Sequence, residues 1–300
     1  MKLGVQLRTS GAEASPESIG AFAEEAERIG LASVWSFERL MDPVDGAVPI
    51  GGGDPVPLPE GYGSVYDPIE TLAYVAARTS TITLGTSVLD ALLHSPVVLA
   101  RRLATVDRLS GGRLLAGIGV GWMVAEFEST GVPTTQRGAR MKDHITAMRA
   151  VWGPDPVEHD GRFYRVGPPS RMGPKPVGPD GVALLAGSML PPAIERAARL
   201  GVGLNPIMMT WEMLEGSITL FRETAEKAGH DAQSLPVVVR VNGPVTPSPL
   251  DERQPLTGSV EQVRDDLEHA RAAGADHVLW AMDTDPDEQL AMMAALQRSV

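Results

Sequence analysis

The chain has 300 residues and a net charge of −12, with 43% hydrophobic residues, 21% charged residues and no cysteine. This is the composition of an ordinary globular protein, and the lack of cysteine excludes disulfides, zinc–thiolate sites and a cysteine nucleophile. The acidic balance argues against nucleic acid or an anionic membrane as a partner, because both require a cationic surface. No apolar run approaches the roughly 20 residues of a membrane helix, and residues 1–8 turn polar too early for a signal peptide. We therefore expect a cytoplasmic protein.

Short β-branched runs alternate with helical stretches eight times along the chain. The predicted strands cover residues 2–7, 32–37, 82–89, 113–118, 182–186, 202–207, 237–241 and 276–281. The predicted helices cover residues 18–29, 68–79, 96–109, 137–152, 192–200, 212–228, 260–273 and 287–298. No Gly-x-Gly-x-x-Gly turn follows the first strand, as a dinucleotide-binding sheet would require. The pattern predicts an α/β fold, a (β/α)8 TIM barrel, forming a single domain over residues 1–300.

Three Pro- and Gly-rich insertions interrupt this pattern after predicted strands two, four and seven. They cover residues 42–66, 154–179 and 242–258. The second contains a predicted hairpin that pairs residues 157–158 with 163–166. Insertions of this length are usually functional, and the active site of such a barrel lies at the carboxyl ends of its strands. We expect all three insertions near the mouth of the barrel.

Charged residues follow the second and third predicted strands. Glu38 and Arg39 stand side by side at the end of strand two, where they would perform acid–base chemistry or clamp an anionic ring. The alternative is a surface ion pair in a loop. His94 follows strand three and titrates near neutral pH, although a single loop histidine is more often a plain polar residue. Ser95 is a predicted N-cap ahead of Pro96.

Glycines mark the ends of strands four and five. Gly117, Gly119 and Gly121 alternate along strand four, with Val120 between them and Trp122 after them. Glycine lets the backbone approach a ligand closely and point N–H groups at an anion, whereas the alternative is a tight turn without a ligand.

Gly187 and Ser188 stand between strand five and a predicted helix. Backbone amides at a helix N-terminus bind phosphate, and Ser188 is equally a candidate N-cap. We predict a phosphate or ring edge at these two strand ends.

Other catalytic schemes lack their motifs. The six histidines are scattered without a helical pair, so we predict no metal site. Neither a Gly-x-Ser-x-Gly elbow nor a Walker loop is present. Redox chemistry here would therefore be carried by a bound organic cofactor.

At these residues the chain resembles the bacterial-luciferase-like family, in particular its branch that uses the deazaflavin coenzyme F420. The densest match covers residues 104–122, continues at 126–127 and 131–133, and includes the hairpin at 161–164. Residues 258–263 and 273–278 resemble the last helix–strand unit of the family.

The resemblance implies a cis peptide bond between Ser87 and Val88 that supports the cofactor ring, and a cofactor phosphate near Gly117–Gly121 and Gly187–Ser188.

Two residue pairs depart from the usual sequence of the family. Glu38 and Arg39 occupy the place of the usual Asp-His pair, and residues 201–204 lack the usual Asp and Trp. Arginine stays protonated, so either Glu38 moves the proton or Arg39 stabilises negative charge. Tyr62 and Tyr66 of the first insertion would lie over the substrate, although loop packing is the simpler role.

The predicted function is therefore hydride transfer between coenzyme F420 and a small organic substrate. An FMN-dependent two-component monooxygenase, supplied by a separate flavin reductase, is the alternative within the same family. A degenerate cofactor-binding barrel without catalysis is the alternative of another class. We expect a homodimer, as is common in the family.

Overall fold

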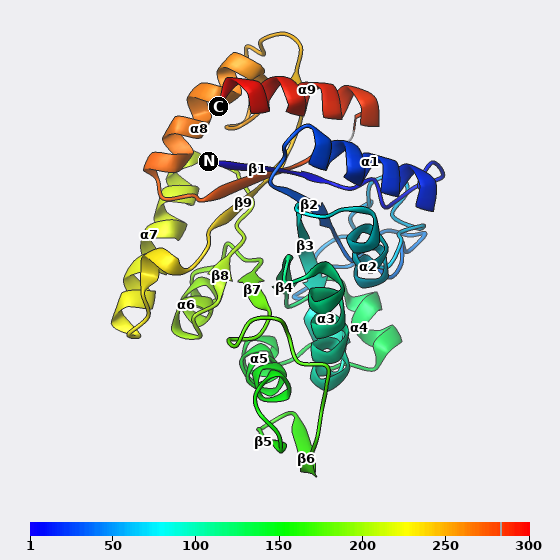
Figure 1. The fold of residues 1–300 in the computed structure, drawn as a ribbon, viewed down its shortest axis with the longest axis vertical. Coiled ribbons are helices and arrows are strands. Elements are labelled where there is room, and N and C mark those ends of the chain that lie inside the picture. The colour runs from blue at the N-terminus through cyan, green and yellow to red at the C-terminus, as the bar shows by residue number, and fades with distance from the viewer. Residues whose placement is uncertain (283) are drawn as a thin grey trace.

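The computed structural model describes residues 1–282 and 284–300. Its main sheet has eight strands, all parallel, in the order β8-β7-β4-β3-β2-β1-β12-β9. Isolated parallel bridges from Leu204 to Val237 and from Ile207 to Arg240 join the two edge strands. The sheet therefore curls into a nearly closed barrel, which confirms the predicted TIM-barrel fold (Figure 1). The barrel strands are β1 (Lys2–Gln6), β2 (Ser33–Ser36), β3 (Thr83–Asp90), β4 (Leu114–Gly119), β7 (Ala183–Ala186), β8 (Gly203–Leu204), β9 (Val238–Asn242) and β12 (His277–Ala281).

Helices cover the outside of the barrel, and α9 lies between α1 and α8 (Figure 1). Five of them begin with proline, which is pre-organised for the first helical position. No helix in the described part of the chain is long and apolar enough to cross a membrane. The helices are α1 (Pro16–Arg28), α2 (Pro68–Arg78), α3 (Pro96–Ser110), α4 (Val124–Thr130), α5 (Arg137–Trp152), α6 (Pro191–Arg199), α7 (Trp211–Lys227), α8 (Val260–Ala272) and α9 (Pro286–Ser299), with 3-10 turns at Ala91–Leu93 and Ala232–Ser234.

The lower part of the lumen is filled by side chains from several strands. Trp35 is fully buried and packs with Leu185, Val238 and Leu279. A Cβ on Gly85 would lie 2.2 Å from the Trp35 ring, so the glycine in β3 makes room for the indole. Close packing of this kind closes the barrel below its mouth.

Two predicted segments differ from the structure. The sixth barrel strand was predicted over residues 202–207, but β8 covers only Gly203–Leu204 because the chain beyond it is held by single bridges. The hairpin strands run further than predicted, as β5 (Val157–Asp160) and β6 (Arg165–Ser170). The predicted pairing was wrong because the tight turn lies at residues 161–164, where the Gly161 N–H donates to the Tyr164 carbonyl.

The first insertion, residues 42–66, reaches across the mouth of the barrel. Val65 forms a bridge with Ser10 after β1, and Pro49 forms a bridge with Met123 after β4. The Ile50 N–H donates to the Trp122 carbonyl at 2.7 Å. These bonds attach the insertion to both sides of the opening, so it forms one wall of the mouth.

The third insertion, residues 242–258, carries two short strands. These are β10 (Val245–Thr246) and β11 (Gly258–Ser259), which pair in parallel outside the barrel. Trp280 of β12 donates from its indole nitrogen to the Leu256 carbonyl at 2.9 Å, so the insertion is anchored to the last barrel strand.

Candidate active site

A bulge interrupts β3 at the mouth of the barrel. The register against β4 shifts between Thr86 and Leu89, and the Ser87–Val88 peptide bond is cis, at the position that the family resemblance implied. The Ser87 hydroxyl donates to Asn205 Oδ1 at 2.7 Å, and Arg240 donates to the Ser87 carbonyl. The Glu38 N–H donates to the Val88 carbonyl at 3.1 Å. The bulge is therefore held from β2, β8 and β9 at once.

The glycines at the ends of β4 and β7 surround the side chain of Val88. A Cβ on Gly119 would lie 2.8 Å from a Val88 methyl, and one on Gly187 would lie 2.6 Å from the other. A Cβ on Gly117 would meet the Thr86 carbonyl at 2.1 Å. These glycines are thus required by the packing of the bulge itself, a role that sequence reasoning did not assign to them.

Glu38 is buried, and both of its carboxylate oxygens are used inside the protein. Oε2 accepts from the Asp90 N–H at 2.7 Å, and Oε1 lies 2.7 Å from His94 Nε2. The His94 side chain keeps 17% of its surface exposed, against 2% for Glu38. The pair therefore connects the buried bulge to the solvent side of the mouth, and the two residues that the sequence singled out separately act together.

Arg39 points into a second buried ion pair. Its Nη1 lies 2.6 Å from Glu126 Oε2 and 3.9 Å from Asp90 Oδ2, and its guanidinium lies 5.4 Å from the centre of the Trp122 ring. Glu126 is fully buried and also accepts from the Leu40 N–H at 3.0 Å. The simple surface ion pair that the sequence allowed for Glu38 and Arg39 is absent, because each residue pairs elsewhere.

The carboxylates at the mouth outnumber the cations that face them. Two of the groups there, Asp90 and His94, have shifted pKa values. Burial raises the pKa of Asp90 to about 7; Arg39 opposes the shift, whereas Glu126 and Glu38 add to it. Burial alone would lower the pKa of His94, but the hydrogen bond to Glu38 and its charge outweigh that effect and raise it. Asp90 Oδ2 is buried without a hydrogen-bond partner. The mouth therefore holds a carboxyl group, that of Asp90, which exchanges its proton near neutral pH.

Arg240 brings a further cation to the bulge from β9. Its Nε donates to Asn242 Oδ1 at 2.8 Å, and it forms no ion pair with any carboxylate among the described residues. Burial lowers the pKa of Arg240, and the nearby Tyr62 opposes that shift. A half-buried guanidinium without a carboxylate partner suits an anionic group of a ligand.

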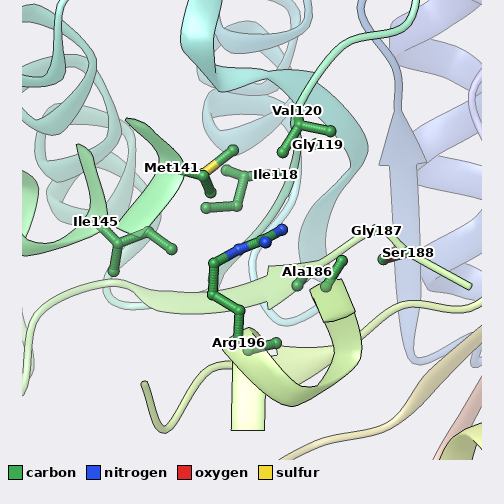
Figure 2. A pocket seen from close by; sticks show the side chains of 11 residues that line it. Ile118, Gly119, Val120, Met141, Ile145, Ala186, Gly187, Ser188 and Arg196 are labelled. Carbon is green, nitrogen blue, oxygen red and sulfur yellow. The ribbon is translucent and has the colours of Figure 1, made fainter. Parts of the chain in front are cut away.

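A pocket of about 30 Å³ lies between the ends of β4 and β7 and the helices α5 and α6. Figure 2 shows the Arg196 side chain extending from α6 into the space between Ile118 and Ala186. Gly119, Val120, Gly187 and Ser188, four of the residues predicted to bind a cofactor, line the same pocket. Burial lowers the pKa of Arg196, whose guanidinium has no ion pair within the described chain. The pocket thus places a cation where the sequence predicted a phosphate.

The remaining predicted residues lie around this centre. The ring of Tyr62 packs 5.1 Å from that of Phe37, whereas Tyr66 is 39% exposed. Ser95 is the N-cap of α3 but makes no side-chain capping bond. Ser188 is not an N-cap: α6 is capped at Leu190, whose N–H donates to the Ser188 hydroxyl at 3.2 Å. The helix begins at Pro191, one residue earlier than predicted, because Pro191 takes its first position.

Sequence reasoning missed several residues of the site. Arg240 interrupts the apolar run of predicted strand seven, and a charge there was a usable signal. Asp90 directly follows the predicted third strand, and Asn205 lies within the predicted sixth strand. Glu126 belongs to residues 126–127, which resemble the family. Arg196 gave no signal of a functional role in the sequence, because a basic residue on a surface helix is ordinary.

Comparison with known proteins supports the family expectation. A model of the luciferase-like monooxygenases matches residues 1–249. An uncharacterised Mycobacterium tuberculosis protein is 36% identical over 181 residues, and the match spans 60% of this chain and 62% of the relative's length. The F420-dependent glucose-6-phosphate dehydrogenase of Kineococcus radiotolerans is 27% identical over 310 residues, covering 96% of this chain and 85% of the enzyme.

Solved structures share the fold over the whole chain. A monooxygenase from Streptomyces bottropensis superposes with a TM-score of 0.80 at 23% identity, covering 99% of this chain and 98% of that one. The FMN complex of the oxygenating component of 3,6-diketocamphane monooxygenase from Pseudomonas putida gives a TM-score of 0.78 at 16% identity, covering 100% of this chain and 98% of that one. An F420-dependent tetrahydromethanopterin reductase from Methanopyrus kandleri gives 0.79 at 16% identity, covering 98% and 97%. The matches thus include both F420-dependent and FMN-containing oxidoreductases. With a family model that covers residues 1–249, the chain belongs to the luciferase-like monooxygenase family.

Proposed function

We propose that the protein is an oxidoreductase that uses the deazaflavin coenzyme F420 to move a hydride to or from a small organic substrate. The observation that carries the proposal is the Arg196 pocket, which lies directly beside the Ser87–Val88 bulge. F420-dependent relatives that align over most of the chain support the choice of cofactor.

The residues of the pocket fit the phosphate of such a cofactor. Arg196 supplies a charge that no described carboxylate neutralises, and Ser188 supplies a hydroxyl at the same wall. A volume of about 30 Å³ is too small for a tricyclic ring, so only the anionic end of the cofactor would enter this pocket. Ser87 and Val88 would then face the ring at the mouth, and the bound deazaflavin would supply two-electron hydride chemistry.

The protein's own charged residues divide the remaining work. Arg240, without a described carboxylate partner, takes the charge-stabilising role that the sequence allowed for Arg39. His94 and Glu38 hold a proton between them at 2.7 Å, next to the bulge. Arg39 and Glu126 fix the wall of the mouth beneath Trp122.

An FMN-dependent monooxygenase, supplied by a separate flavin reductase, is the second candidate. The Arg196 pocket suits FMN as well as coenzyme F420, because FMN also ends in a phosphate. A similar solved structure contains FMN. A cofactor-binding barrel without catalysis is the third. A homodimer and a cytoplasmic location remain part of the proposal.

The proposal is tested by titrating the purified protein with coenzyme F420 and, separately, with FMN, following cofactor fluorescence. We expect tighter binding of the deazaflavin. Replacing Arg196 by Gln should weaken that binding roughly 10- to 100-fold, the usual effect of losing a charge-assisted hydrogen bond. The matched control is Arg199→Gln, because Arg199 lies on the same helix but pairs with Glu195 on the surface. Preference for FMN would move the function to the monooxygenase, and binding of neither cofactor would refute both.

A further inference from the structure

Four arginines gather around the first turn of α5, next to the pocket. Arg137 donates to the Gly121 carbonyl at 2.6 Å, and a Cβ on Gly138 would lie 2.8 Å from Arg196 Nη1. Arg162 of the hairpin turn donates to Gln136 Oε1 at 2.7 Å, at the start of the same helix. Of this arginine cluster (Arg137, Arg140, Arg162 and Arg196), Arg196 lines the pocket, and the other three lie on or against the first turn of α5, one turn before the lining residue Met141.

Arg140 and Arg162 are held in place by an aromatic ring. Their guanidinium carbons lie 4.6 Å and 4.8 Å from the centre of the Phe163 ring. Arg162 is exposed and Arg140 is half-buried, so both present donors to solvent. Stacking on a ring fixes each guanidinium at a low cost in side-chain entropy. Arg140 Nε donates to the Thr135 carbonyl and Arg162 Nη2 donates to Gln136, which leaves the other nitrogens of each guanidinium for a ligand.

The carboxylate of Asp143, which lies on α5 and contacts the hairpin, is already occupied. Asp143 lies 2.8 Å from His159 Nε2 and accepts from the N–H groups of Phe163 and Tyr164. None of the four arginines forms an ion pair with a carboxylate in residues 1–282 or 284–300. A chain with a net charge of −12 therefore concentrates uncompensated positive charge beside its phosphate pocket.

FMN ends at its phosphate, whereas coenzyme F420 continues beyond the phosphate into a chain of glutamate residues that each carry a carboxylate. We propose that Arg140 and Arg162 bind the carboxylates of this glutamate tail and thereby select the deazaflavin over FMN. The inference rests on the proposed function, because it requires the phosphate to lie in the Arg196 pocket. Guanidinium groups suit the task, since they bind carboxylates through two parallel hydrogen bonds.

The test compares the affinity of three forms of the deazaflavin: with the glutamate tail, with the phosphate but no glutamates, and without both. Fluorescence titration at low salt should show the tailed form binding about three- to tenfold more tightly than the tail-less phosphate, the gain expected from two exposed ion pairs. The gap should shrink as NaCl is raised, because salt screens exposed charges. The form without phosphate should bind most weakly.

The double variant Arg140→Gln/Arg162→Gln should bind both phosphate forms equally. Arg140→Lys/Arg162→Lys should keep most of the gap, which shows that charge and not the fold of the hairpin is responsible. Arg165→Gln is the matched control, because Arg165 lies on the same hairpin but pairs with Asp160. Equal binding of both phosphate forms by the wild type would overturn the tail site and leave the proposed function intact. Binding of no deazaflavin at all would overturn both.

Discussion

The two ends of the barrel lumen contain the same kinds of residue in opposite states. At the lower end His277 lies 2.7 Å from the Ser33 hydroxyl, which also accepts from the Trp35 indole N–H. At the mouth His94 lies 2.7 Å from the Glu38 carboxylate. Burial lowers the pKa of His277 to about 3, whereas Glu38 raises that of His94. One histidine is thus a neutral packing residue, whereas the surroundings of the other favour its charged form.

The difference shows that the buried charges of this part of the fold are concentrated at the mouth and not in the lower layer. The lower layer combines neutral hydrogen bonds with apolar packing around Trp35. The mouth holds Glu38, Asp90 and Glu126 against Arg39 and His94, and leaves Asp90 Oδ2 and Arg39 Nε without hydrogen-bond partners. Unsatisfied buried groups are costly and persist mainly where function requires them. We therefore assign stability to the lower layer and chemistry to the mouth.

The largest effect is expected from breaking the buried ion pair at the mouth. Arg39→Met leaves Glu126 fully buried without its cation, and should lower the free energy of unfolding by about 3–5 kcal/mol. Urea denaturation measures the loss. Adding Glu126→Gln should restore part of it, because the uncompensated charge is then removed. Arg165→Met, at a pair exposed on the hairpin, should cause no measurable change; a similar loss there would contradict the argument.

A smaller effect is expected from overfilling the lower layer. Gly85→Ala places a Cβ 2.2 Å from the Trp35 ring, and should lower the free energy of unfolding by about 1–3 kcal/mol. Gly216→Ala is the matched control, because nothing lies within 4 Å of a Cβ there and alanine favours the α7 helix. The control should be neutral or stabilising in the same urea experiment. If Gly85→Ala were equally harmless, the lumen would not be closely packed.

The two layers should also respond to pH in opposite directions. Folded His277 stays neutral while the unfolded side chain takes up a proton below about pH 6.5, so its contribution to stability is lost as the pH falls from 6.5 towards 3. Folded Asp90 keeps its proton up to about pH 7 while the unfolded side chain loses it near pH 4, so its contribution is lost as the pH rises between those values.

Each group should change the slope of stability against pH by up to about 1.4 kcal/mol per pH unit. Relative to the wild type, Asp90→Asn should make stability rise more steeply between pH 5 and 6.5, and His277→Gln should make it rise less. Urea midpoints at the two pH values test this. Parallel slopes in all three proteins would refute the contrast between the layers.

Sequence reasoning recovered the barrel because eight strands alternate with helices, and topology then brought the residues at the strand ends together. It failed where the signal was short or distant. β8 is two residues long, and α4 has seven residues, too few to show a helical period. The partner of Arg39 lies 87 residues away in the sequence, so no local pattern could show that Glu126 would neutralise it.

The most direct test of the account is a crystal structure of the protein with coenzyme F420 bound. We predict the phosphate at Arg196, between the ends of β4 and β7, and the ring against Ser87 and Val88 at the mouth of the barrel. A cofactor bound anywhere else, or a ring that does not contact the bulge, would contradict the assignment of chemistry to this end of the molecule.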